Sequence, residues 1–527
     1  MTQLTNSRIG GVSHRWLALG SLTLALITIG LDQTVLSLAL PTLAGSLKAT
    51  ESQLQWFVTA YTLALAAAML PAGLLGDRYG RKTVLVGAIL MFGAMSIAYA
   101  YAPDANAFIA ARAVLGVAGA ALMVMSLSVV TVLFSETERP RAMGIWAAGN
   151  FLAMPLGPIV GGYLLAHVWW GWVFLMNVPV VLVGLPAVIA FVPQSRSEHR
   201  PSIDIGGVLL SSTGLAALMY GLVQAGDCGW GSSDAIIPSV VALAILAAFV
   251  AWELWLTERP NGQPLVDLGL FRSRSFSVGL VLAGAGIFGM FGVLFALPQY
   301  LQAVMGVDAQ GAGLRFLPMI LGMVVGAVPA DRVSARLGAK ITVAVGFAIL
   351  ATGMFVGSAM TVSTSDAYIA AFTFVVGAGA GMGLATAASA AMIEISAERS
   401  GVGGALVQAV VKLGPAFGAA ILGSVLSNTY QSHVSVAGLP ATAAAGVHES
   451  VFKALAVAAQ IGSPALAESA RAAFVVGMDD ATRVAAAIAV AAMVGALVLL
   501  PRRAAAQSAA PSGPELPPIG GAVPVGD

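Results

Sequence analysis

Long runs of apolar residues alternate with short polar or Gly/Pro-rich breaks along almost the whole chain. An α-helix needs roughly 20 consecutive apolar residues to cross the hydrocarbon core of a bilayer, which is about 30 Å thick. By this criterion the sequence predicts fourteen transmembrane helices. The predicted spans are 16–40, 54–76, 83–103, 107–133, 143–167, 172–192, 203–224, 235–257, 276–301, 312–332, 340–361, 366–392, 401–427 and 480–500.

The composition fits a chain whose solvent is a lipid bilayer. Hydrophobic residues make up 58% of the 527 residues and charged residues only 9%, and the mean hydropathy is +0.90. Soluble proteins carry about 25% charged residues, so we predict an all-α membrane protein. The net charge of +1 argues against nucleic acid as a partner. The single cysteine, Cys228, excludes an internal disulfide and a cysteine-based metal site.

Positively charged residues predict the orientation of the chain. If the N-terminus lies inside, 18 of the 25 Lys and Arg residues fall in cytoplasmic segments, as the positive-inside rule requires. Four fall outside, and three fall within predicted helices: Arg112, Arg315 and Lys412. Both termini are therefore expected in the cytoplasm. The sequence does not reveal the roles of Arg315 and Lys412.

A short motif, R-x-G-x-K, occurs at 78–82 and again at 336–340 and indicates two related halves. If the seventh and eighth helices are an inserted pair, each copy follows the second helix of a six-helix half. The alternative is that short basic loops resemble one another anyway. Transporters built from repeats bind their substrate between the halves. The predicted division is 1–195 for the first half, 196–275 for the inserted pair with its linkers, 276–503 for the second half and 504–527 for a tail.

Two segments of this division are not expected to span the membrane. Residues 428–479 form a long external connection, for which we predict a surface hairpin of short helices. The tail at 504–527 is rich in Pro, Ala and Gly, and such a composition predicts disorder.

Asp32 lies inside the first apolar run, in the stretch LDQTVLSLALP at 31–41. An aspartate at the centre of a membrane helix costs on the order of 2.5–3.5 kcal/mol, so such residues mostly face a partner or water. Together with Ser21, Ala25 and Thr28, it forms a small, polar stripe at helical spacing. Since burial disfavours the charged form of a carboxyl group, Asp32 is a candidate proton carrier. The alternative is a protonated, hydrogen-bonded helix contact.

Arg112 is the predicted partner of Asp32. Their depths differ by only roughly 5 Å, at about 1.5 Å per helical residue counted from the outer end of each predicted helix. A guanidinium at that distance would stabilise the carboxylate and would be released when the carboxylate takes a proton. The alternative is an arginine whose side chain extends to the membrane surface.

The break GLLGDRYGRK at 73–82 predicts a tight cytoplasmic turn between two membrane helices. Its glycines allow close approach, and its aspartate can cap a neighbouring helix N-terminus. By itself a charged turn would be only a topology signal. The stretch resembles the loop motif G-x-L-x-D-R-x-G-R-K of the major facilitator superfamily. This resemblance implies a cytoplasmic gate formed by Gly76, Asp77, Arg78, Gly80, Arg81 and Lys82.

Further stretches strengthen the resemblance. ARAVLGVAGAA at 111–121 resembles the helix-four motif of the superfamily, with Arg112 as its arginine, and GNFLAMPLGPIVGG at 149–162 resembles the helix-five motif of its antiporters. LDQTVLSLALP, with QWFVTAYTLALA at 55–66 and LPQYLQAVMG at 297–306, resembles the fourteen-helix drug:proton antiporters of the QacA/EmrB type. One departure is Ala335, which occupies the second-half position that matches Asp77.

Small residues in helix five form a second motif with a physical interpretation. An i, i+4 ladder of small residues lets another helix pack closely, and prolines free backbone carbonyls. The resemblance implies a dry interface between the halves that blocks leakage of protons. The residues of this antiporter motif are Gly149, Ala153, Gly157, Pro158, Gly161 and Gly162.

Aromatic and methionine side chains are candidates for a substrate cavity, since they can adapt to flat cations through soft packing and cation–π contacts. The same residues are equally well explained as lipid-facing or interfacial. The candidates are Trp56, Tyr61, Trp146, Met154, Phe291, Phe295 and Tyr300.

The resemblance implies the major facilitator fold, with two six-helix halves plus two inserted helices. It also implies a monomeric, proton-coupled multidrug exporter of the bacterial inner membrane that expels lipophilic, mostly cationic compounds by alternating access. Such a protein uses the proton gradient and no cofactor, and neither catalytic residues nor a metal site are expected. The alternatives are a dedicated exporter of one antibiotic, siderophore or metabolite, and a membrane-embedded enzyme or receptor.

Overall fold

The chain is described by a computed structural model that covers residues 12–49, 51–135, 138–196, 204–259, 262–393 and 400–501. These residues form helices and connections, without a strand. The predicted all-α class is therefore confirmed for this part of the chain. The tail at 504–527, for which disorder was predicted, lies outside the described residues.

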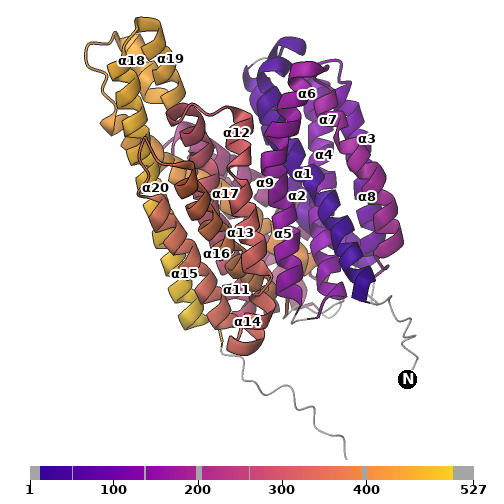
Figure 1. Ribbon diagram of the computed structural model, residues 1–527. Coiled ribbons are helices and arrows are strands. Elements are labelled where there is room, and N and C mark those ends of the chain that lie inside the picture. Colours follow the sequence, from indigo (N-terminus) through magenta and orange to yellow (C-terminus); the bar gives the residue numbers. More distant parts are fainter. Residues whose placement is uncertain are drawn as a thin grey trace, which may run out of the picture.

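The first half follows the six predicted spans (Figure 1). Its fifth span contains a π-helical turn, η1, and its sixth span is divided near its start. The elements are α1 (Val12–Ser46), α2 (Glu51–Tyr79), α3 (Arg81–Ala100), α4 (Ala105–Leu133), α5 (Arg139–Leu156), η1 (Gly157–Gly161), α6 (Gly162–His167), α7 (Trp172–Leu175) and α8 (Asn177–Phe191).

Two long helices and a short linker separate this half from the second. They are α9 (Ile205–Cys228), α10 (Ser233–Thr257) and the 3-10 turn η2 (Leu268–Arg272). Besides α10, α9 packs against α2 of the first half and α17 of the second. Ser212 donates a hydrogen bond to the Ala67 carbonyl (2.7 Å), and Trp230 donates one to the Ala420 carbonyl (3.1 Å). The inserted pair is therefore attached to both halves.

The second half begins with α11 and ends with α20. Its elements are α11 (Arg274–Gln299), the π-helical turn η3 (Tyr300–Val304), α12 (Ala309–Leu314), α13 (Leu317–Ala327), α14 (Ala330–Leu337), α15 (Ala339–Gly357), α16 (Asp366–Ile393), α17 (Ser400–His433), α18 (Ala441–Glu449), α19 (Val451–Ile461) and α20 (Pro464–Leu499).

Twelve helices in the described part of the chain are long and apolar enough to cross a membrane. Two predicted spans are not among them: 143–167 is divided by η1, and 312–332 overlaps the shorter apolar segment Gly311–Ala327, most of which is α13. The described helices thus establish a multi-pass membrane protein, and the count of fourteen spans stays a prediction.

The connection predicted at 428–479 is shorter than expected. It contains the short helices α18 and α19, but residues 464–479 belong to α20, which begins at Pro464. The Ser463 side chain caps this helix by accepting a hydrogen bond from the Leu466 N–H (3.3 Å). Charged residues such as Glu468 and Arg471 lowered the apolar character of this stretch and concealed a helix whose other face is buried.

The two halves lie side by side in Figure 1, with α1–α8 on one side and α11–α20 on the other. Across the boundary, α5 packs against α13 and α16, and α17 packs against α2 and α4. The approach of α5 to α13 is so close that a Cβ atom at Gly144 would collide with the Ala327 methyl group. Glycine at this position therefore allows the contact between the halves.

Candidate functional site

A cavity of about 460 Å³ lies between the halves. Its volume falls within the range of about 300–1,000 Å³ that is typical of small-molecule sites. Residues from α1, α2, α4, α5, α9, α11, α16 and α17 line it, and most of them are apolar. The polar and charged residues of the described lining are Thr62, Tyr61, Arg112, Gln408 and Lys412.

Asp32 lies in α1 beside this cavity, with 1% of its surface exposed. Its Oδ2 atom accepts a hydrogen bond from Arg112 Nη1 on α4, in an ion pair. Its Oδ1 atom accepts one from the Tyr99 hydroxyl on α3. The predicted pair of Asp32 and Arg112 is therefore present, with a hydroxyl as a third member that the sequence reasoning missed.

Arg112 connects the pair to α2 and to the cavity. Its Nε atom donates to the Phe57 carbonyl (3.0 Å), and its guanidinium carbon lies 4.6 Å from the centre of the Tyr61 ring. Glycines in the same helix make this approach possible, because a Cβ atom at Gly116 would collide with the Tyr61 backbone. Arg112 lines the cavity whereas Asp32 does not. A change in the charge of Asp32 therefore affects the cavity through Arg112.

An aromatic cluster surrounds the hydroxyl of Tyr99. The Tyr99 ring lies 4.5 Å from the ring of Phe174 and 5.3 Å from that of Phe108, and Phe57 packs 4.4 Å from Phe108. All four side chains are fully buried. The ion pair is thus screened from water, which strengthens its electrostatic interaction. A tyrosine near the end of an apolar helix was the only sequence signal for this partner.

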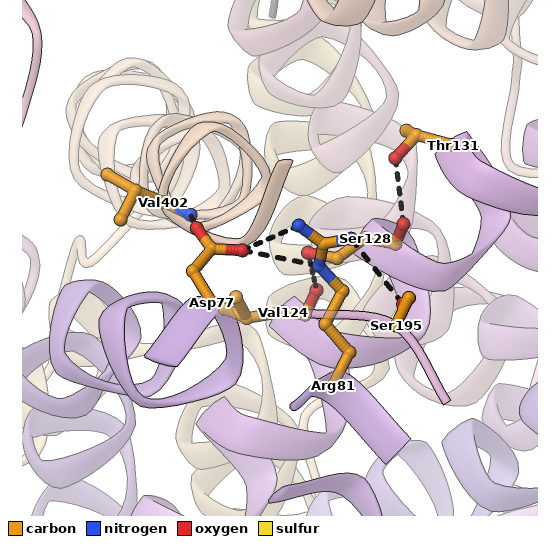
Figure 2. A network of polar contacts seen from close by, with 7 residues as sticks. All are labelled: Asp77, Arg81, Val124, Ser128, Thr131, Ser195 and Val402. Atoms are coloured by element: carbon orange, nitrogen blue, oxygen red, sulfur yellow. Dashed lines mark hydrogen bonds and ion pairs between the residues drawn. The ribbon is translucent and has the colours of Figure 1, made fainter. Parts of the chain in front are cut away.

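The turn between α2 and α3 contains a second buried ion pair, shown in Figure 2. Asp77 Oδ1 accepts from Arg81 Nη2 (2.7 Å) and Nε (3.2 Å). Asp77 Oδ2 accepts from the backbone N–H of Val402 (3.0 Å), in the first turn of α17 in the other half. A carboxylate at a helix N-terminus is stabilised by the helix dipole. Asp77 therefore caps a helix across the boundary between the halves.

The remaining residues of this turn contact neighbouring parts of the first half. Gly80 has a φ of 105°, which strongly favours glycine. The next residue, Arg81, donates its backbone N–H to the Ser195 carbonyl (2.9 Å) after α8. Lys82 Nζ donates to the Ile189 carbonyl (2.6 Å), and the Arg78 guanidinium lies 5.6 Å from the ring centre of its neighbour Tyr79. Gly76 lies so close to Met125 of α4 that a Cβ atom would displace that side chain.

Two small residues of helix five pack against α1 of the same half. Gly149 packs against Thr23 and Gly161 against Val35, both on α1 of the same half. A Cβ atom at either position would therefore meet α1, while η1 also packs against α12 of the other half. A ladder of small residues predicts close approach of some helix and cannot identify which one.

The π-helical turn η1 also interrupts the regular i, i+4 spacing of this ladder, since a π turn contains more residues than an α turn. Gly157 and Pro158 both lie in η1, and Gly162 has open space beside it. The side chains of Ala153 and Pro158 lie outside those that the structure describes.

The predicted cavity residues divide into two groups. Tyr61 and Trp146 line the cavity, and the Trp146 indole donates to the Ser126 hydroxyl (3.0 Å). Trp56, Phe295 and Tyr300 are not in the described lining: 42% of Trp56 is exposed, and the Tyr300 hydroxyl is bonded to the Thr361 carbonyl. The side chains of Met154 and Phe291 lie outside those that the structure describes.

Several lining residues were not predicted. Met219 and Val223 extend from the inserted helix α9, and Gln408 and Lys412 from α17. Lys412 was noted as a charge within a span, but nothing in the sequence indicated the direction of its side chain. Among the described residues, no group of three or more His, Cys, Asp or Glu side chains could hold a metal ion.

A comparison with sequence families identifies the family of the chain. Residues 22–419 match the family model of the Major Facilitator Superfamily. The chain belongs to this superfamily. The prediction made from its motifs is thereby confirmed, and the protein is a multi-pass transporter-family protein of the inner membrane.

Relatives of known name cover nearly the whole chain. It is 32% identical over 491 residues to the multidrug efflux pump LfrA of Mycolicibacterium smegmatis, covering 92% of this chain and 96% of that protein. It is 30% identical to the tetracenomycin C resistance and export protein of Streptomyces glaucescens, with coverage of 97% and 98%. The methyl viologen resistance protein SmvA of Salmonella typhimurium is also 30% identical, with coverage of 88% and 93%.

Solved structures show the same fold at lower identity. The human organic anion transporter MFSD10 has a TM-score of 0.59 and 13% identity, covering 94% of this chain and 100% of that one. The proton:xylose symporter XylE has a TM-score of 0.57 and 15% identity, with coverage of 92% and 95%. At these identities the likeness concerns the fold alone.

Proposed function

We propose that this superfamily member is a proton-coupled exporter of lipophilic drugs. The observation that carries the proposal is the cavity between the halves, whose wall includes an arginine paired with the buried carboxylate of Asp32. The names of the relatives, which include multidrug efflux and drug resistance proteins, support export of drugs. Proton coupling is supported by the position of Asp32, because ionisable residues inside membrane spans mark proton and substrate pathways.

In the proposed mechanism, protonation of Asp32 removes the negative charge that pairs with Arg112. Breaking a buried ion pair from one side leaves the other charge uncompensated, at roughly 3–5 kcal/mol. This free energy would drive Arg112, and with it α4 and the cavity wall, toward a second arrangement. Direct competition between a substrate cation and the proton for Asp32 is a second way to couple transport to protonation. That competition would require substrate contact with Asp32, which lies behind Arg112.

The contact of Asp77 with α17 would act as the cytoplasmic gate. A charge-assisted hydrogen bond contributes about 1.5–3 kcal/mol, enough to bias an equilibrium between two states of the halves. When the halves are closed at this turn, the cavity would open on the opposite side, and rocking of the halves would supply alternating access.

The proposal includes fourteen spans with both termini in the cytoplasm, acting as a monomer that exchanges protons for small molecules. The division at 195 and 275 into two halves and an inserted pair belongs to it as well. The excess of positive charge in the expected cytoplasmic segments supports this orientation. In a Cys228→Ser background, cysteine at Ser435 should react with an impermeant maleimide in intact cells, and cysteine at Gln194 only after permeabilisation. The reverse pattern would overturn the orientation.

Everted membrane vesicles test the exporter directly. Vesicles that contain the protein should accumulate ethidium when respiration acidifies their interior, and a protonophore should release it. Vesicles from cells without the protein serve as the control. Accumulation that persists after the gradient has collapsed would contradict proton coupling, and no difference from control vesicles would contradict export of this drug.

A dedicated exporter of one compound is the second candidate, because the relatives include a tetracenomycin C export protein and a probable actinorhodin transporter of Streptomyces coelicolor. A panel of unrelated drugs in the same vesicles separates the two functions. Transport of a single chemical class would favour the dedicated exporter.

A further inference from the structure

Lys412 of α17 lines the central cavity, and the proposed coupling does not use it. Among the described residues it forms neither a hydrogen bond nor an ion pair. The cavity wall around its ammonium group is mostly apolar. An ammonium group without a counter-charge in such a place is unfavourable unless a partner arrives. The cavity therefore contains a positive charge that remains available to a bound molecule.

Gln408 supplies a second unpartnered polar group at the same place. It precedes Lys412 by four residues, so the two lie on one face of α17. Gln408 also lines the cavity, only 2% of it is exposed, and its Oε1 atom has no hydrogen-bond partner. Buried polar atoms are satisfied in the great majority of cases. An unsatisfied amide oxygen beside an unpaired ammonium indicates that a bound molecule supplies the polar partner of both groups.

The charges around the cavity determine which group would bind there. Arg112 is already engaged with Asp32, the Phe57 carbonyl and the Tyr61 ring. The described lining contains no Asp or Glu. An ammonium donates hydrogen bonds and accepts none, so its natural partner is an anionic oxygen. The rest of the wall is apolar and includes Trp146 and Met219, which suits a lipophilic ring system.

We propose that Lys412 and Gln408 form a subsite for the acidic group, a carboxylate or phenolate, of a lipophilic substrate. The ammonium of Lys412 pairs with the anionic oxygen, and the Oε1 atom of Gln408 accepts a hydrogen bond from a neighbouring hydroxyl of the substrate. This inference rests on the proposed export function and adds a substrate class to it. This class differs from the mostly cationic range that the family resemblance implied.

Two dyes with one ring system test the subsite. Rhodamine 110 carries a free carboxylate, and rhodamine 123 is its methyl ester. Binding of each dye to the purified full-length protein in detergent is followed by fluorescence polarisation at one fixed pH. Lys412→Met removes the charge at nearly constant length, and Lys412→Arg keeps it. Lys453→Met, on the exposed surface of α19, is the matched control.

We expect Lys412→Met to weaken binding of rhodamine 110 at least about tenfold, as loss of one charge-assisted contact implies, and to leave rhodamine 123 within about twofold. Lys412→Arg should retain most of the affinity for the acid, and Lys453→Met should bind both dyes like the wild type. Gln408→Leu should weaken binding of rhodamine 110 by less than Lys412→Met does. If Lys412→Met reduced the affinity for both dyes equally, or for neither, the subsite would be overturned. A wild-type protein that binds neither dye would overturn it as well.

Transport separates the failure of this inference from the failure of export. Suppose that wild-type vesicles transport rhodamine 123 with the proton gradient, but binding of rhodamine 110 does not depend on Lys412. This result would refute the subsite and leave the proposed exporter function intact. Binding of the acid that depends on Lys412, without gradient-driven transport of either dye, would support the subsite and refute the proposed function.

Discussion

The turn between α2 and α3 and the turn between α14 and α15 share a backbone and differ in their charges. In each, a glycine with positive φ precedes the next helix: Gly80 at 105° and Gly338 at 83°. The first turn buries Asp77 and Arg81. The second has alanine at both matching positions. The repeated backbone therefore serves the packing of helices, whereas the polar contact to the other half is formed at the first turn.

The ion pairs of the two halves differ in the same way. Two pairs of the first half, Asp32 with Arg112 and Asp77 with Arg81, have side chains that are at most 3% exposed, and a third, Arg15 with Glu138, is 28% and 29% exposed. In the second half, Arg315 and Asp366 are 28% and 60% exposed. Buried pairs are strongly coupled to their surroundings, whereas exposed pairs contribute little. We therefore place the coupling and gating chemistry in the first half.

Asp32→Asn should have the largest effect. Asparagine keeps the size of the side chain and can still accept a hydrogen bond, but it binds no proton. We expect the protein to insert at near wild-type levels and proton-driven efflux to fall roughly 100-fold or more, in line with the roughly 3–5 kcal/mol at stake in a buried pair. Asp32→Glu should retain part of the activity. Efflux in everted vesicles, normalised to protein amount, measures both.

Asp366→Asn in the second half is the matched control, and we expect its efflux to stay within about twofold of the wild type because its ion pair is exposed. Full efflux by the Asp32→Asn protein would make Asp32 a packing residue. A large loss with Asp366→Asn would remove the contrast between the halves.

Asp77→Asn should have an intermediate effect. It removes the charge that caps α17 and leaves Arg81 buried without its partner. Loss of about 1.5–3 kcal/mol shifts the equilibrium between the states of the halves by roughly 10–150-fold. We expect efflux to fall about tenfold or more while insertion is unchanged. Adding Ala335→Asp, which introduces a carboxylate at the second turn, should not rescue efflux. Normal efflux by a fully expressed Asp77→Asn protein would reduce the motif to a topology signal.

Met219→Ala should have the smallest effect, and it examines the helix inserted between the halves. Met219 is buried and lines the cavity from α9. Its truncation should weaken dye binding about two- to fivefold, since lost apolar contact is modest in a cavity that can adapt. Val241→Ala, on the exposed face of α10, is the control and should bind like the wild type. Identical affinities for all three proteins would show that α9 serves only packing.

The sequence predicted those features that follow from one strong physical cost. A carboxylate in an apolar span needs a partner, which led to Asp32 and Arg112, and a charged turn with glycines led to the cap formed by Asp77. Features that depend on the direction of a side chain were not predictable. Tyr99, the neighbour of Gly149 and Gly161, and the position of Lys412 in the cavity wall all depend on the rotation of helices that are apolar on every face.

The absence of acidic residues from the described cavity lining has an electrical consequence. Exchange of one outgoing monocation for one incoming proton moves no net charge. Export of a monoanion against one incoming proton moves two charges in the direction that an inside-negative membrane potential favours, at about 2.3 kcal/mol per charge for each 100 mV. A carrier that holds its substrate at Lys412 is therefore driven by voltage as well as by pH, and acidic compounds would continue to leave the cell when the pH gradient alone has vanished.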